Sequence, residues 1–155
     1  ARHGSRLSGL PALADDSGIC IHALQNTPGV HSARWSSMRG GPAGDAANNQ
    51  MVNRQMDGLS SGASFVCVLV FLRSADDPVP VIAEGLWHGH WLSAPRGDRG
   101  FGYDPHFLPQ GMKKTAAEMS VVQKNKHSHR ALAMRAMVRQ LKGRGILVPR
   151  NHSNH

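Results

Sequence analysis

Two adjacent carboxylates, Asp15 and Asp16, stand out in a chain of 155 residues that has 10 acidic residues against 18 Lys and Arg. Carboxylate oxygens suit Mg²⁺, which usually takes one or two of them together with phosphate oxygens and water. If the pair ends a strand, the two side chains point to opposite faces, so one would face a site directly and the other would support it from beside. Taken alone, Asp-Asp-Ser-Gly is more commonly a turn, because Asp and Ser bond their own backbone and Gly accepts positive φ.

A second candidate is the segment from Gly100 to Pro105, which reads Gly-Phe-Gly-Tyr-Asp-Pro. Phe101 lies between two glycines, so its ring could stand against a planar ligand, and Asp104 could accept hydrogen bonds from ring nitrogens. The alternative is a tight surface turn whose aromatic side chains pack into the core. No Gly-Lys-Ser or Gly-Lys-Thr follows the glycines, which excludes the familiar phosphate loop.

The third candidate gathers cations at an expected helix start, in the segment from Lys124 to Arg130. Cationic donors beside free backbone amides suit an anion or the carbonyl oxygens of a base. His127 and His129 are two residues apart, which places them on different faces of a helix and argues against a metal pair. A solvated basic helix end is the alternative.

Charge is unevenly distributed along the chain, whose formal net charge is +8. From Lys113 onward there are ten basic residues and one acid, Glu118. This basic part favours an anionic partner, although charge alone does not separate a solvated face from a site for nucleic acid or phosphorylated ligands.

The length predicts one domain with a full core. No apolar run of about 18 residues and no cleavable leader pattern occurs, so we expect no membrane partner and a cytoplasmic location. Cys20 and Cys67 lie inside apolar runs and predict packed thiols, with no disulfide framework or zinc spacing.

The expected elements alternate between strand and helix. Residues 11–14 and 19–24 predict short strands that flank an Asp-Asp-Ser-Gly turn. Residues 46–56 favour a helix capped by Asp45, although Asn49 and Asn53 occupy its expected apolar stripe. Residues 65–72 are uniformly apolar, which predicts a strand buried on both faces.

The second half predicts a strand, or two, over residues 80–92, broken at Gly85 and Gly89, and then a loop over residues 94–105. Capping boxes at Thr115 and Ser120 predict helix starts, and residues 128–142 favour a final helix. We therefore expect one domain over residues 1–142 and a loose tail over residues 143–155.

The order of these segments resembles the inosine triphosphate pyrophosphatase family, whose members cleave non-canonical purine nucleoside triphosphates. The resemblance covers nearly everything up to Lys142. The matching segments are Leu10-Pro11-Ala12-Leu13-Ala14-Asp15-Asp16-Ser17-Gly18, Pro28-Gly29-Val30, Ser32-Ala33-Arg34-Trp35, Phe65-Val66-Cys67-Val68-Leu69, Gly100-Phe101-Gly102-Tyr103-Asp104-Pro105, Lys114-Thr115-Ala116-Ala117-Glu118-Met119, Lys124-Asn125 and Ser128-His129-Arg130.

The resemblance implies an α/β fold with an elongated mixed central sheet flanked by helices, two lobes with a substrate cleft, and a homodimer. It also implies hydrolysis of ITP, dITP and XTP to the monophosphate and pyrophosphate, with Mg²⁺ as cofactor. Such a reaction removes these nucleotides from the pool. No specific nucleic acid partner is expected.

The same resemblance implies roles for particular residues. Asp16 would be the general base and, with Asp15, would hold the metal ion. Substrate would be bound by the following residues: Ser17, Phe101, Gly102, Tyr103, Asp104, Lys124, His129 and Arg130.

The family's opening strand, its Thr/Ser-Gly-Asn-x-x-Lys triphosphate segment and a later metal-binding Glu have no counterpart in the sequence. We therefore expect the N-terminal strand and helix of the fold to be missing and the chain alone to be poorly active. Two alternatives remain open: a nucleotide pyrophosphatase with another base preference, and a basic nucleic-acid-binding or inactive remnant of the fold.

Overall fold

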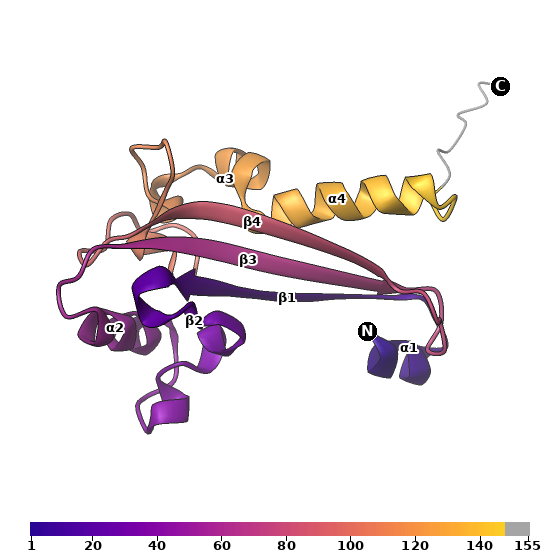
Figure 1. The fold of residues 1–155 in the computed structure, drawn as a ribbon, viewed down its shortest axis with the longest axis horizontal. Helices are drawn as coiled ribbons and strands as arrows, with labels where there is room; N and C mark the ends of the chain where they lie inside the picture. Colours follow the sequence, from indigo (N-terminus) through magenta and orange to yellow (C-terminus); the bar gives the residue numbers. More distant parts are fainter. Residues whose placement is uncertain (148–155) are drawn as a thin grey trace.

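The computed structural model describes residues 1–147 and shows a long antiparallel sheet with helices on its two sides (Figure 1). Its strands and α-helices are, in order, α1 (Arg2–Ser8), β1 (Ala12–Ile21), β2 (Thr27–Pro28), α2 (Asp45–Met56), β3 (Ser61–Leu72), β4 (Val81–Trp91), β5 (Phe107–Pro109), α3 (Val121–His127) and α4 (His129–Gly143). Short 3-10 turns cover His22–Leu24, Gly29–Arg34, Ser37–Arg39, Asp104–His106 and Ala116–Glu118. No helix among these residues is long and apolar enough to cross a membrane.

The strand order is β2-β1-β3-β4-β5, and each of these pairings is antiparallel. The three long strands β1, β3 and β4 carry most of the ladder and give the sheet its elongated shape (Figure 1). The predicted α/β fold with an elongated sheet flanked by helices is confirmed.

The prediction of two short strands around an Asp-Asp-Ser-Gly turn was wrong. β1 runs without interruption through this stretch, with Asp15 opposite Leu69 and Asp16 opposite Val68. The backbone hydrogen bonds to an apolar neighbouring strand outweigh the local turn preference of Asp, Ser and Gly. Gly18 is required for a different reason: a Cβ there would overlap with the carbonyl oxygen of Gly29.

The strand predicted for residues 65–72 lies inside β3, but its two faces are not equally buried. Phe65, Cys67 and Leu69 are buried, whereas the alternate residues Val66 and Val68 are half-buried. The other face is therefore only partly covered.

β4 continues through Gly85 and Gly89, so the predicted breaks were also wrong. A Cβ at Gly85 would overlap with the carbonyl oxygen of His129 and the amide nitrogen of Ala133. The glycine therefore allows the first turn of α4 to approach the sheet.

Two clusters make up the core. The first surrounds Phe65, Trp87 and Phe107, under the loops at one end of the sheet. The second packs α4, through Met137 and Leu141, against β3 and β4. Figure 1 shows α4 running alongside β4, so that its N-terminus lies near α3.

The helices predicted from sequence are confirmed, with changes at two of the expected starts. Both capping boxes form, but the box at Thr115 opens only a three-residue 3-10 turn, whereas the box at Ser120 starts α3. The predicted final helix is α4. α2 begins at Asp45, but Gly44 is its N-cap and the Asp45 side chain does not cap the helix. Of the predicted tail, Ile146 packs partly buried against the second cluster, and residues 148–155 lie outside the described residues.

Candidate active site

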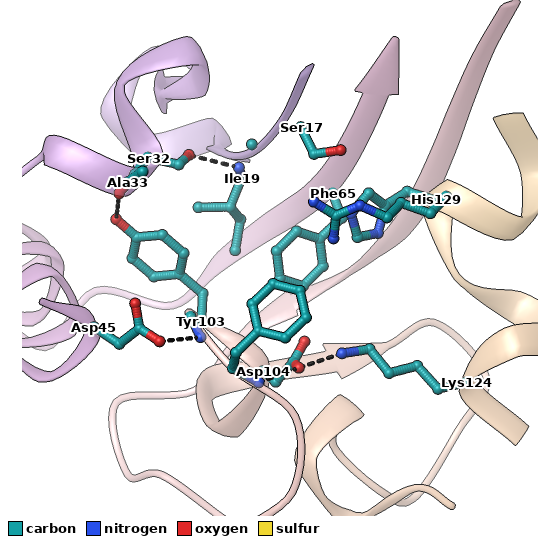
Figure 2. Close-up of a pocket in the computed structure, with 14 residues that line it drawn as sticks. Ser17, Ile19, Ser32, Ala33, Asp45, Phe65, Tyr103, Asp104, Lys124 and His129 are labelled. Atoms are coloured by element: carbon teal, nitrogen blue, oxygen red, sulfur yellow. Dashed lines mark hydrogen bonds and ion pairs between the residues drawn. The ribbon is translucent and has the colours of Figure 1, made fainter. Parts of the chain in front are cut away.

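A cavity of about 160 Å³ opens beside β1, between α2, the loop before β5 and the start of α4 (Figure 2). All eight residues expected to bind substrate line it. Its full lining is Ser17, Gly18, Ile19, Ser32, Ala33, Asp45, Phe65, Phe101, Gly102, Tyr103, Asp104, Lys124, His129 and Arg130. Segments that are more than a hundred residues apart in sequence thus meet at one hollow.

Asp104 and Lys124 form a salt bridge in the wall of the cavity (Figure 2). The Asp104 side chain is 3% exposed and also accepts a hydrogen bond from the Phe101 backbone amide, 2.9 Å away. Both interactions use Oδ2 of the carboxylate. The second oxygen, Oδ1, has no hydrogen-bond partner within residues 1–147 and is therefore available to a ligand.

The Phe101 ring is 61% exposed, although a Phe side chain is normally buried. Two cations lie near its face: Nζ of Lys124 is 4.9 Å and Cζ of Arg130 is 5.4 Å from the ring centroid. Cation–π contacts of this kind hold a ring without covering it. The site thus presents an aromatic surface against which a planar base can stack.

His129 is the first residue of α4 and lies against the ring of Phe65, with centroids 4.8 Å apart and planes 12° apart. Burial, and then the charges of Arg130 and Lys124, lower the pKa of His129 to about 4, so the imidazole is neutral at pH 7. Its Nδ1 atom is buried and has no hydrogen-bond partner within residues 1–147. A buried ring nitrogen without a partner is a candidate contact for a bound ligand.

Tyr103 supports the cavity rather than offering it a hydroxyl. Its hydroxyl donates a hydrogen bond to the carbonyl oxygen of Ser32, 2.8 Å away, and its ring packs edge-on against Trp91. Burial, followed by the negative charge of Asp45, raises the pKa of the Tyr103 hydroxyl.

Asp15 and Asp16 point to opposite faces of β1, as alternation along a strand requires. Asp15 turns toward the cavity side, where it accepts hydrogen bonds from Nε of Arg130 at 3.2 Å and from Oγ of Ser17 at 2.8 Å. Its side chain is 40% exposed. Asp15 thereby orients Arg130, whose side chain lines the cavity.

Asp16 borders a neighbouring hollow on the other face of the strand. This second hollow is lined by Asp16, Ser17, Gly18, Cys20, Gly29, Val30, Val66 and Val68. Ser17 and Gly18 line both hollows, so the second lies directly beside the first. The Asp16 carboxylate is exposed and has no protein hydrogen-bond or ion-pair partner within residues 1–147.

The same part of the chain holds no group of three or more His, Cys, Asp or Glu side chains that could bind a metal by themselves. The carboxylates present fit a hard divalent cation that takes few protein ligands and completes its shell with phosphate oxygens and water. They do not fit a cage made of protein side chains alone. Asp16 is the better placed of the two carboxylates, because Asp15 is already engaged with Arg130.

Sequence reasoning did not single out several residues of the cavity. Asp45 was interpreted as a helix cap, and Phe65 as a strand residue without a role in the site. Ser32 and Ala33 lie in a segment that matched the family in order, but nothing in their types predicted a place in the wall. Only the alternation of Ile19 with Ser17 along β1 could have indicated that both face one hollow.

Comparison with known proteins supports the family resemblance found in the sequence. Residues 1–140 match the Ham1 family. The dITP/XTP pyrophosphatase of Ralstonia nicotianae is 59% identical over 143 residues, which are 92% of this chain and 71% of the relative. The enzyme of the same name from Neisseria meningitidis serogroup A is 51% identical over 142 residues, covering 91% of this chain and 70% of the relative.

Solved structures agree with the fold. A HAM1 protein from Coxiella burnetii superposes with a TM-score of 0.84 at 41% identity, covering 92% of this chain and 73% of that one. A nucleoside-triphosphatase / dITP/XTP pyrophosphatase from Mycobacterium abscessus gives a TM-score of 0.70 at 36% identity, covering 96% of this chain and 70% of that one. The resemblance found in the sequence is thus confirmed, and this chain belongs to the Ham1 family.

Proposed function

We propose that this protein hydrolyses the non-canonical purine nucleotides ITP, dITP and XTP to the monophosphate and pyrophosphate, and so removes them from the nucleotide pool. The observation that carries the proposal is the meeting of eight expected substrate-binding residues in one cavity, beside an exposed carboxylate. The names of the Ralstonia and Neisseria relatives support the same substrate class.

The first cavity would take the base. Phe101 would stack on the purine, and Lys124 and Arg130 would donate hydrogen bonds to the 6-oxo group of hypoxanthine or xanthine. Asp104 Oδ1 would accept from the N1–H group that these bases carry. Adenine would present its amino group to the donors Lys124 and Arg130 and an unprotonated N1 to the acceptor Asp104. Such mismatched buried groups discriminate strongly against adenine nucleotides.

The second hollow would take the reacting phosphate, with Asp16 as general base. Its carboxylate would accept a proton from water while the water oxygen bonds to the α-phosphorus and the bond to the leaving pyrophosphate breaks. Ser17, which lines both hollows, would touch the substrate between base and phosphates. Mg²⁺ held by Asp16 would neutralise the phosphate charge. Asp15, which was expected to share the metal ion, lies on the other face of β1 and would orient Arg130 instead.

Two further properties belong to the proposal. We infer a homodimer, which would cover part of the outer sheet face where Leu86 of β4 is 43% exposed. A wild-type protein that sediments as a monomer at micromolar concentration would rule the dimer out. We also infer a cytoplasmic location, where the nucleotide pool is found.

The test is a hydrolysis panel with Mg²⁺, in which pyrophosphate release is measured for ITP, dITP, XTP, ATP and dUTP. The chain spans 71% of the Ralstonia nicotianae dITP/XTP pyrophosphatase, which is assayed beside it as the reference for turnover. The expected kcat/KM for ITP exceeds that for ATP by on the order of 100-fold or more. Preference for dUTP would support the alternative base preference, and equal turnover of ATP and ITP would overturn the proposal.

A further inference from the structure

Three asparagines of the helix α2 bond segments elsewhere in the fold, and two of them, Asn49 and Asn53, stand where an apolar stripe was expected. Asn48 is 2% exposed; it accepts a hydrogen bond from the Ser36 amide at 2.8 Å and donates one to the carbonyl oxygen of Ala33 at 3.2 Å. Asn53 donates to the carbonyl oxygen of Ser93 at 3.0 Å. α2 therefore fastens loops as well as contributing to the core.

Two side chains of α2 bond the backbone of Gly102, one at its amide and one at its carbonyl oxygen. The amide of Gly102 donates to Oδ2 of Asp45 at 2.6 Å, and Nδ2 of Asn49 donates to the carbonyl oxygen of Gly102 at 3.0 Å. Asp45 and Asn49 are four residues apart, so they stand on the same face of the helix. Gly102 has a φ of 61°, a left-handed conformation that favours glycine, and the two bonds fix it there.

The bonds at Gly102 matter because the preceding residue, Phe101, is held by polar contacts of the site rather than by the core: Asp104 accepts from its amide, and Lys124 and Arg130 lie near its ring. Phe101, the preceding residue, is 61% exposed, so core packing does not fix its ring. Asp45 lies across the cavity from Lys124 and His129, so the loop that carries Phe101 is held from α2 on one side and by the Asp104–Lys124 pair on the other (Figure 2). Losing the α2 bonds would loosen the loop beside the stacking ring, although Asp104 would still hold the Phe101 amide.

We propose that Asp45 and Asn49 are positioning residues that hold Gly102, and through it Phe101, ready for the base. This inference rests on the proposed function. Because Asp16 lies on the other face of β1, the positioning effect falls on base binding and leaves the water-activating step in place. Asp45 acts as a hydrogen-bond acceptor for the Gly102 amide, and its negative charge is not needed for that role.

The experiment compares Asp45→Ala, Asp45→Asn, Asn49→Ala and, as a matched control on the same helix, Asn53→Ala. We expect Asp45→Ala and Asn49→Ala each to raise KM for ITP about five- to tenfold, the effect of one lost hydrogen bond, with kcat within about twofold of the wild type. Asp45→Asn keeps an acceptor oxygen and should restore KM. Asn53→Ala should leave KM unchanged whatever it does to the thermal midpoint.

A second readout does not depend on turnover. Hydrogen–deuterium exchange of the Gly102 amide should accelerate in Asp45→Ala and Asn49→Ala and stay slow in Asn53→Ala. The positioning role would be overturned if Asp45→Ala and Asn49→Ala both kept the KM and the Gly102 exchange rate of the wild type. It would also be overturned if Asp45→Asn raised KM as much as Asp45→Ala does. A wild type that neither binds nor hydrolyses ITP would instead overturn the proposed function, and the exchange data would still show whether α2 holds the loop.

Discussion

Asp15 and Asp16 differ in role because one strand turns their side chains to opposite faces. Asp15 meets Arg130 beside the first cavity, and Asp16 stands free at the second hollow. Alternation along a strand predicted that the two side chains would point to opposite faces, but it did not predict the contact between Asp15 and Arg130. The sequence did not predict the contacts of Asp45 and Asn49, because a hydrogen bond to a glycine more than fifty residues away leaves no signal in residue type or spacing.

At the residue scale, the buried His129 makes folding stability depend on pH. Its folded pKa of about 4 lies below the ordinary value of 6.5. Between these values the unfolded chain binds a proton and the folded chain does not, so stability is full above pH 6.5 and is lost as pH falls toward 4. From pH 7.5 to pH 5 this loss amounts to roughly 2 kcal/mol.

The measurement is urea denaturation of the wild type and of His129→Gln at both pH values. The wild type should lose roughly 2 kcal/mol more than the variant between pH 7.5 and pH 5, because other titrating groups affect both proteins equally. Equal losses in the two proteins would mean that His129 is not held neutral by its surroundings.

Among the elements, the start of α3 was predictable because a capping box is a local pattern, and the box at Ser120 formed as expected. The box at Thr115 also formed, but only a three-residue 3-10 turn follows it. The strands were harder. Whether Asp-Asp-Ser-Gly turns or extends depends on pairing with β3, about fifty residues later in the chain, and local propensity carries no information about that partner. Gly85 looked like a strand break for the same reason, since α4 approaches it only in the folded protein.

The close approach of α4 to β4 predicts the effect of Gly85→Ala. The added methyl group would overlap with backbone atoms of His129 and Ala133, so the helix start must shift. We expect a loss of about 1–3 kcal/mol in the free energy of unfolding, measured by urea denaturation, and a higher KM for ITP. Gly4→Ala in α1 is the control, because nothing lies within 4 Å of its added Cβ. Stability and KM equal to the control would show that α4 is not seated on β4 as described.

At the scale of the whole molecule, the net charge of +8 was readable from composition, and the structure adds where part of it acts. Lys124 and Arg130 line the cavity, while Arg135 and Arg139 of α4 are exposed and have no acidic partner within residues 1–147. Such a field attracts a nucleoside triphosphate before it binds.

This charge predicts that salt weakens capture of substrate more than turnover. Raising NaCl from 50 to 300 mM should lower kcat/KM for ITP several-fold while kcat changes little, because screening acts on association. Steady-state kinetics at fixed free Mg²⁺ provide the measurement. An unchanged kcat/KM would contradict a role for the overall charge in capture.

Whether Asp16 activates water is tested by measuring pyrophosphate release from ITP in the wild type, in Asp16→Asn and in the exposed control Asp76→Asn. We expect Asp16→Asn to lower kcat by on the order of 100-fold or more and to leave the thermal midpoint unchanged, while Asp76→Asn matches the wild type. A nucleic-acid-binding remnant would instead bind any duplex in a salt-dependent way, with no dependence on Asp16. Wild-type turnover in Asp16→Asn would contradict the account.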